Sequence, residues 1–283
     1  MMEEPKEKFV NSTDFEQILL KRENLDTVEG AFAYRGGKSL DKPGLAKRER
    51  IQIDLVDEMG KPIRWYMKRY GSDSFFKRLG RWIIGKGRSS PARREYENIC
   101  QLSAIGIPTM RAITFGEERD FLGVKRSYLI VSAVPGEALE RCFDDYFRRI
   151  NENPAAIEKF NQALVNLIRK LHDNGLVHRD LYASHIFLDA TNDDVELYLI
   201  DLARVFAPVS WRRFRWRVKD LAELKYSMPS AWVERYWDDF LKMYLSDDKL
   251  FPKWSKAIDK KVAWMLRRCR RKELREGIRK KTN

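Results

Sequence analysis

Cysteine and histidine are both scarce in this sequence of 283 residues, which contains three of each. Cys100, Cys142 and Cys269 are far apart and odd in number, so we expect reduced thiols rather than a disulfide framework. No stretch approaches the roughly 18 apolar residues that mark a membrane-spanning helix. No apolar segment follows the charged start at residues 1–7, so we expect no secretory signal peptide. These absences favour a protein that works inside the cell.

Acidic residues are also in deficit, because 42 Asp and Glu residues stand against 55 Lys and Arg residues, for a formal net charge of +13. Such a surplus favours polyanionic partners such as nucleic acid, phosphorylated glycans or an anionic membrane surface, without choosing among them. A hydrophobic content of 43% and an aromatic content of 12% argue against a disordered chain. The length suits one large domain or two lobes that meet at a cleft.

The three histidines all lie within residues 171–188. His178, Arg179 and Asp180 form a sequence typical of a phosphotransferase catalytic loop, in which Asp180 accepts the proton of an attacking hydroxyl. His185 follows where protein kinases carry a metal-binding Asn. A zinc site is the alternative, but the histidine spacings do not put the three side chains on one helix face, and no Cys is nearby. We therefore predict a catalytic loop.

The pattern of residues 27–70 predicts three antiparallel strands, over residues 28–34, 51–56 and 63–68. Gly36 and Gly37 lie between the first two of these strands. Because glycine lets backbone amides approach a ligand closely, we expect this loop to contact nucleotide phosphates. The loop does not fit the pattern G-x-G-x-x-G, and a plain hairpin loop is the alternative.

Lys68 lies at the end of the third predicted strand, where a kinase holds the ammonium group that contacts nucleotide phosphates. Such a lysine needs a carboxylate from the following helix to hold its position. Ser90 as N-cap and Pro91 in the first turn predict that this helix starts near residue 90, and Glu95 is the candidate carboxylate. The alternative is that Lys68 and Glu95 are two ordinary surface charges.

The rest of the chain is predicted to be mainly helical after two further strands, near residues 110–116 and 127–131. Asn153 as N-cap and Pro154 as the first helical residue predict a long helix with one apolar stripe. Gly175 is expected to end it. This helix would deliver the histidine-bearing loop to the active site.

After that loop, residues 186–188 and 195–200 predict a hairpin whose second strand runs directly into Asp201. A carboxylate at the exit of an apolar strand is well placed to ligate a Mg²⁺ ion that bridges nucleotide phosphates. Capping of the next element is the alternative role for Asp201.

Three later features have more than one interpretation. Residues 211–217 interleave arginines with aromatic residues, which suits a basic surface, a phosphate-rich acceptor or single-stranded nucleic acid. Asp220, near the start of a predicted helix over residues 218–224, is expected to cap that helix, to brace the backbone of the catalytic loop, or to do both. Residues 264–281 are a strongly basic helix candidate, which suits an anionic membrane surface, a solvated tail or a nucleic-acid signal.

Three segments, residues 177–188, 199–204 and 215–221, resemble the bacterial lipopolysaccharide core kinases that phosphorylate heptose or Kdo. The N-terminal half is similar to these kinases more loosely, and the resemblance covers roughly residues 27–245. The looser matches are residues 66–68, 90–96, 106–108 and 126–130. The resemblance implies a two-lobed, protein-kinase-like α+β fold, with an antiparallel-sheet N-lobe over residues 1–132 and a mainly helical C-lobe over residues 133–283.

The resemblance also implies roles for the site residues. Asp180 is implied to be the catalytic base, Lys68 and Glu95 the pair that contacts the phosphates of ATP, and Asp201 the ligand of Mg²⁺. A histidine at the position of His185 is part of the family pattern. His185 is therefore a candidate metal ligand together with Asp201. Because imidazole is a poor ligand for Mg²⁺, the alternative is that His185 hydrogen-bonds a phosphate or Asp201.

The prediction is an ATP-dependent kinase that transfers the γ-phosphoryl group to a heptose or Kdo hydroxyl. The expected acceptor is the lipopolysaccharide core or a lipid A-core precursor, met in the cytoplasm at the anionic face of the inner membrane, and no nucleic acid is expected. A kinase of a protein or another small molecule is one alternative. A pseudokinase that binds anionic membrane or nucleic acid is another. Nothing in the sequence indicates an oligomeric state.

Overall fold

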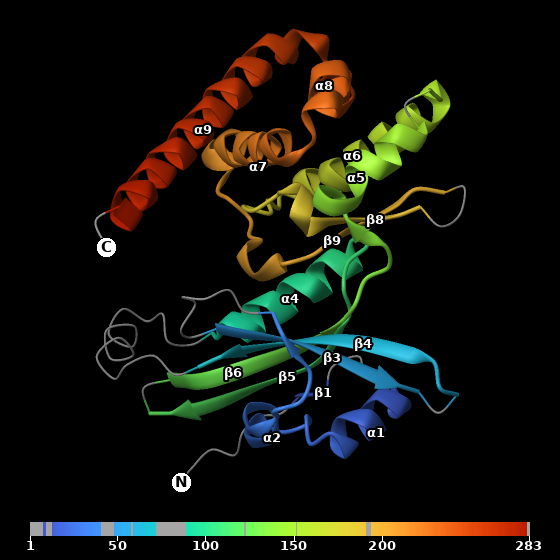
Figure 1. The fold of residues 1–283 in the computed structure, drawn as a ribbon, viewed down its shortest axis with the longest axis vertical. Coiled ribbons are helices and arrows are strands. Elements are labelled where there is room, and N and C mark those ends of the chain that lie inside the picture. The colour runs from blue at the N-terminus through green and yellow to red at the C-terminus, as the bar shows by residue number, and fades with distance from the viewer. Residues whose placement is uncertain are drawn as a thin grey trace. The chain divides into compact units, whose positions relative to one another are not determined.

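The computed structural model describes residues 8–9, 13–40, 48–57, 59–71, 89–121, 123–150, 152–190 and 194–281 (Figure 1). The chain divides into two units. The first is Met1–Val134 with Asp201–Ala203, and the second is Pro135–Ile200 with Arg204–Asn283. The short segment Asp201–Ala203 therefore belongs to the first unit, although the chain reaches it from the second.

The first unit is built on an antiparallel sheet of six described strands in the order β1-β5-β6-β4-β3-β2. The strands are β1 (Lys8–Phe9), β2 (Lys38–Ser39), β3 (Arg48–Val56), β4 (Pro62–Tyr70), β5 (Ala112–Asp120) and β6 (Gly123–Ser132). The strands predicted at residues 51–56, 63–68 and 127–131 are confirmed, and the one predicted at residues 110–116 is found as β5.

Because side chains alternate along a strand, the two faces of this sheet carry different residues. Ile51 and Ile53 on β3 and Trp65 and Met67 on β4 are buried in one hydrophobic core with residues of the helices α1 (Asp14–Arg22) and α2 (Val28–Ala33). Lys68 follows Met67 and therefore points to the other face. Figure 1 shows α1 and α2 on one side of the sheet and α4 (Pro91–Ala104) on the other.

The prediction of a strand at residues 28–34 is wrong, because Val28–Ala33 forms helix α2. The Thr27 hydroxyl caps this helix by accepting a hydrogen bond from the Gly30 amide at 3.0 Å. Val28 and Ala31 are both buried, and their spacing of three follows a helix face rather than the alternation of a strand. The first strand of the predicted three-stranded array is instead β2, which pairs with β3.

Helix α4 begins as its sequence predicts. The Ser90 hydroxyl accepts a hydrogen bond from the Arg93 amide at 2.9 Å, and Pro91 occupies the first turn. The buried side of α4 is apolar except for Glu95. A carboxylate on the buried face of a helix costs free energy unless it is paired, so its partner defines the site described below.

The second unit is mainly helical and also contains a small antiparallel sheet of β7, β8 and β9. The helices are α5 (Leu139–Ile150), α6 (Pro154–Asp173), α7 (Arg213–Ser227), α8 (Ser230–Leu245) and α9 (Phe251–Lys281), and the strands are β7 (Glu137–Ala138), β8 (Ile186–Asp189) and β9 (Glu196–Leu199). Asn153 caps α6 by accepting a hydrogen bond from the Ala156 amide at 3.2 Å. Gly175 follows the helix with a φ of 76°, as predicted for a helix end.

The predicted hairpin after the histidine-bearing loop is confirmed, because β8 and β9 pair antiparallel with Ile186 opposite Leu199. The helix predicted at residues 218–224 begins earlier than expected, at Arg213. Within the described part of the chain, none of the helices has both the length and the apolar character to cross a membrane.

Candidate active site

Lys68 and Glu95 form a buried ion pair in the first unit. The Lys68 ammonium donates a hydrogen bond from β4 to Glu95 Oε1 on α4. The Lys68 side chain is 10% exposed and the Glu95 side chain is 0% exposed, so water is largely excluded from the pair. The predicted contact is therefore present, while its role toward a nucleotide stays a prediction.

Tyr70 completes the surroundings of Glu95. Its hydroxyl donates a hydrogen bond to Glu95 Oε2 at 3.2 Å, so both carboxylate oxygens have a donor. Burial, together with the neighbouring Glu95 charge, raises the pKa of Tyr70. The phenol therefore stays protonated and keeps donating at neutral pH. Glu95 is held on both sides, which makes it a rigid anchor for the Lys68 ammonium.

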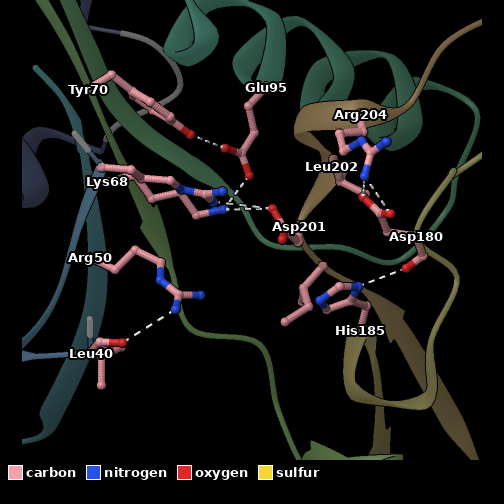
Figure 2. Close-up of polar contacts among 12 residues, drawn as sticks. Leu40, Arg50, Lys68, Tyr70, Glu95, Asp180, His185, Asp201, Leu202 and Arg204 are labelled. Carbon is pink, nitrogen blue, oxygen red and sulfur yellow. Dashed lines mark hydrogen bonds and ion pairs between the residues drawn. The ribbon is translucent and has the colours of Figure 1, made fainter. Parts of the chain in front are cut away.

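Asp201 lies beside this pair (Figure 2). Its Oδ1 is 3.5 Å from Lys68 Nζ and 3.4 Å from Arg48 Nη2. Burial disfavours the charge on Arg48, but Tyr70, Asp201 and Glu95 together raise its pKa, so Arg48 stays a cation. Two cations and a carboxylate thus converge on one side of the sheet, a charge pattern suited to phosphate groups with a divalent metal.

The backbone around Asp201 is held in an unusual conformation. Asp201 has a φ of 57°, in the left-handed region that Asp tolerates better than most residues. The Asn98 side chain on α4 donates a hydrogen bond to the Leu202 carbonyl at 2.7 Å, which fixes the following residue to the same helix that carries Glu95. The strain and the tether together aim the carboxylate at Lys68 and Arg48.

Gly36 and Gly37 lie elsewhere in the first unit, where they line a separate pocket of about 570 Å³ together with Arg69. Arg69 follows Lys68 on β4 and therefore points to the opposite face of the sheet. Gly37 has a φ of 82°, and a Cβ there would lie 2.4 Å from the Gln52 carbonyl oxygen, so local packing already requires a glycine. The structure does not bring these glycines to Lys68, and their contact with phosphates stays a prediction.

Asp180 lies in the second unit, in the loop that follows α6. Both of its carboxylate oxygens accept hydrogen bonds from Arg204 Nη1, at 2.7 and 2.8 Å. Its backbone carbonyl accepts a hydrogen bond from His185 Nδ1 at 2.8 Å (Figure 2). Since a carbonyl only accepts, the hydrogen of His185 is on Nδ1, and a neutral ring carries its lone pair on Nε2.

Helix α7 holds the backbone of the catalytic-loop candidate through Asp220. Its Oδ2 accepts the His178 amide at 2.7 Å, and its Oδ1 accepts the Arg179 amide at 2.8 Å. Asp220 is fully buried in the middle of α7, so the predicted role as a helix cap is wrong. The two hydrogen bonds to the loop amides confirm the bracing role. Arg179 has a φ of 71°, and these bonds help to hold that strained conformation next to Asp180.

The histidines have separate hydrogen-bond partners. His172 Nε2 donates to Asp220 Oδ2 at 3.2 Å, and its Nδ1 accepts from the Tyr244 hydroxyl at 2.8 Å. His178 Nε2 donates to the Ile200 carbonyl at 3.0 Å. These bonds link α6, α7 and the end of β9 to the loop. Both ring nitrogens of His172 and Nε2 of His178 are thus engaged in hydrogen bonds that hold the fold, which argues against the zinc alternative.

Among the described residues, no group of three or more His, Cys, Asp or Glu side chains is arranged to hold a metal by itself. Mg²⁺ does not require such a group, because it is usually held by one or two carboxylates together with substrate phosphates and water. Asp201 fits this requirement because it supplies the carboxylate, while its cationic neighbours Arg48 and Lys68 could hold the phosphates. His185 fits less well, since Mg²⁺ prefers oxygen ligands. Metal binding by Asp201 and His185 stays a prediction.

Sequence reasoning missed three residues of these clusters: Arg48, Tyr70 and Arg204. Arg48 and Tyr70 are paired across β3 and β4, and this register is not visible in either segment alone. Arg204 stands only three positions after Asp201, so its presence was visible but its partner Asp180 was not. A cation shortly after the metal-ligand candidate was the one signal available.

The sequence model of the lipopolysaccharide kinase (Kdo/WaaP) family matches residues 45–244. The matched region contains every predicted site residue except Gly36 and Gly37. This match confirms the resemblance drawn from the motifs around Asp180 and Asp201.

Two curated relatives carry the same name. The chain is 32% identical over 160 residues to the lipopolysaccharide core heptose(I) kinase WaaP of Escherichia coli K12, which covers 54% of this chain and 59% of the relative. It is 29% identical over 140 residues to the protein of that name from Pseudomonas aeruginosa, which covers 48% of this chain and 52% of the relative. The chain thus spans little more than half the length of these curated relatives.

A solved structure described as "WaaP in complex with acyl carrier protein" superimposes with a TM-score of 0.63 at 24% identity, covering 93% of this chain and 98% of that chain. This likeness confirms the predicted α+β fold, with an antiparallel sheet in the N-terminal part and helices in the C-terminal part. Because the family match also extends over more than half of the sequence, the chain belongs to the lipopolysaccharide kinase (Kdo/WaaP) family.

Proposed function

We propose that this protein is an ATP-dependent kinase that transfers the γ-phosphoryl group to a sugar hydroxyl of the lipopolysaccharide inner core. The observation that carries the proposal is the buried Lys68–Glu95 pair with Asp201 beside it. A buried lysine fixed by a carboxylate is the arrangement that kinases use for nucleotide phosphates. Membership in a lipopolysaccharide kinase family supports a sugar rather than a protein as the acceptor.

In the proposed reaction, Lys68 and Arg48 bind phosphate oxygens, and Glu95 keeps the Lys68 ammonium in place. Asp201 would hold Mg²⁺, which when bound supplies positive charge to the phosphates. Asp180 accepts the proton of the acceptor hydroxyl while that oxygen bonds to the γ-phosphorus and ADP leaves. Positioning and charge neutralisation supply most of the catalysis in such transfers.

The acceptor sugar is proposed to be heptose, with Kdo as the second candidate. The support is the name heptose(I) kinase of the curated relatives. The comparison that tests this choice uses two acceptors, a core that contains heptose and a truncated core that ends at Kdo. Transfer to the first acceptor alone supports heptose. Transfer to the truncated core would reassign the acceptor to Kdo.

The test of the catalytic assignment is phosphate transfer from ATP to purified core oligosaccharide, followed by mass spectrometry of the product. Asp180→Ala is expected to lower the transfer rate by about 10²–10⁴-fold, because the hydroxyl loses its proton acceptor. Asp194→Ala is the matched control, since Asp194 lies on the β8–β9 hairpin with a largely exposed side chain paired with Lys159. Wild-type transfer by the Asp180 variant would overturn its role as the base.

An acceptor panel separates the alternatives. Transfer to a protein or to an unrelated small molecule, with none to the core, would replace the sugar kinase by another kinase. A complete lack of transfer at saturating nucleotide would favour a pseudokinase. Under the proposed function, the protein works on the cytoplasmic side of the inner membrane as a peripheral protein, where its positive charge meets an anionic surface.

A further inference from the structure

A pocket of about 730 Å³ lies within the second unit next to the proposed base. Asp180, Tyr182 and Arg204 line one part of it, and residues of the helices α7 and α9 line the rest. These two helices pack against one another, as Figure 1 shows. A molecule in this pocket would have direct access to the Asp180 carboxylate.

The α9 wall of the pocket is positively charged. Lys261, Arg268 and Arg271 line it together with Trp264, at spacings of three and four residues that place them on one helix face. Arg267 and Arg270 lie on the same helix but do not line the pocket. The positive charges of α9 therefore lie on two faces of the helix, one that lines the pocket and one that does not.

The charges in the pocket do not balance. Asp180 is paired with Arg204, and Glu223 on α7 is paired with Lys219. Within the ranges that the structure describes, Lys261, Arg268 and Arg271 form no salt bridge with a carboxylate, and the Glu223 carboxylate near Lys261 is already bound by Lys219. Burial and, after it, the nearby Lys219 charge lower the pKa of Lys261, while the Glu223 charge acts in the opposite direction. The two carboxylates are thus already paired, and positive charge is left over.

Trp264 orders two of these cations. Lys261 Nζ lies 3.8 Å from the centroid of its ring, and the Arg268 guanidinium carbon lies 5.5 Å from it. Such cation–π contacts hold flexible side chains in place without neutralising their charge. Trp264 as a residue is still 45% exposed, so part of its apolar ring remains available to a ligand. The wall offers oriented positive charge beside an aromatic surface, which suits an acidic saccharide.

We propose that this pocket binds the acceptor as an acidic saccharide, with a carboxylate or phosphate group held by Lys261, Arg268 and Arg271 while a hydroxyl reaches Asp180. This inference rests on the proposed function and adds to it the chemistry by which the acceptor is selected. The shared chemistry is an oxyanion attached to the sugar. A neutral saccharide would leave the three cations without a counter-charge and would bind more weakly.

The test compares two double variants of the full chain that remove the same charge from α9. Arg268→Gln with Arg271→Gln removes cations from the pocket, and Arg267→Gln with Arg270→Gln removes cations outside it. With core oligosaccharide as the acceptor, we expect the first variant to raise the acceptor KM by about tenfold or more, because charged hydrogen bonds are lost. The KM for ATP and the thermal unfolding midpoint should stay near their wild-type values. The control variant should keep the acceptor KM within about twofold.

Chemically modified acceptors identify the anionic group. If the group is a carboxylate, core oligosaccharide with its carboxyl groups reduced to alcohols should bind the wild type and the pocket variant equally weakly. If the group is a phosphate, dephosphorylated oligosaccharide should bind the wild type and the pocket variant equally weakly. An equal rise of the acceptor KM in the pocket and control variants would overturn the proposal, because only the total charge would then matter. An unchanged KM in the pocket variant would overturn it as well.

Failure of the proposed function gives a different result. If the wild type transfers no phosphate to any core acceptor, calorimetric titration with core oligosaccharide still tests the pocket. Binding by the wild type and the control variant, but not by the pocket variant, would support the pocket while removing the reaction. Equal binding by all three proteins, or by none, would reject the pocket.

Discussion

Glu95 shows how one residue can determine the geometry of a site. Its carboxylate is completely buried, so it is stable only because Lys68 and Tyr70 both donate to it. Removing one partner of such a pair typically costs about 3–5 kcal/mol, since the remaining charge stays buried without compensation. This cost explains why the ammonium of Lys68 stays close to Glu95 and Asp201 rather than turning to solvent.

Glu223 is a second buried carboxylate, and it makes stability depend on pH. Burial raises its pKa to about 7, which Lys219 partly opposes and the Asp220 and Asp180 charges reinforce. In the folded chain it therefore stays protonated at pH values where the unfolded chain, with an ordinary pKa of 4.5, has already ionised. The contribution of Glu223 to the free energy of unfolding is full below 4.5 and is lost as the pH rises toward 7.

We expect this loss to be on the order of 1–3 kcal/mol between about pH 4.5 and pH 7. Glu223→Gln removes the titrating group, so the difference in unfolding free energy between the wild type and the variant should change over this interval. Urea unfolding at a series of pH values measures both curves. Parallel curves for the two proteins would show that Glu223 titrates normally.

At the scale of elements, α7 supports the loop that carries Asp180. Asp220 reaches from this helix to two consecutive backbone amides, those of His178 and Arg179, and to the ring of His172 on α6. Two helices and one loop thus share a single buried carboxylate. The loop conformation includes a positive φ at Arg179, which a flexible loop would not keep without such support.

Asp220→Asn tests this support. The amide that replaces one oxygen cannot accept a hydrogen bond, so one buried backbone donor loses its partner and the free energy of unfolding should fall by about 1–3 kcal/mol. Hydrogen exchange at the amides of His178 and Arg179 should become faster than in the wild type. Asp238→Asn on the exposed side of α8 is the control. Unchanged exchange at both amides would mean that the loop holds its conformation without Asp220.

At the scale of the whole molecule, the net charge of +13 is the dominant property. Long-range attraction between this charge and an anionic surface acts over a Debye length and weakens when salt is added. Under the proposed function the acceptor is presented at such a surface, so the same charge would bring the protein to the membrane and the acceptor to the pocket.

We therefore expect the protein to sediment with vesicles that contain phosphatidylglycerol and not with vesicles of pure phosphatidylcholine. Raising the salt from about 0.1 M to about 1 M shortens the Debye length from about 10 Å to about 3 Å and should release most of the bound protein. Binding that is equal on both vesicle types, or that survives high salt, would point to an apolar contact instead.

Features that depend on neighbours in the chain could be predicted well. The caps of α4 and α6 and the end of α6 at Gly175 are local, because the groups involved are a few residues apart. The motifs at residues 177–188, 199–204 and 215–221 identified the family, since a motif is visible along the chain even where contacts are unknown. The strand predicted at residues 28–34 failed because the Thr27 cap favours a helix over the apparent alternation.

Contacts between distant segments required the folded structure. Arg48 meets Asp201 through the register of β3 with β4, and Arg204 meets Asp180 through the packing of two loops. The basic segment near the C-terminus was readable as a charged helix, but its division into a pocket face and an outer face depends on how α9 packs against α7. The motifs along the chain thus determined the family and the candidate site residues. The pairing of charges and the shape of the proposed acceptor pocket come from burial and packing between elements, which no local pattern records.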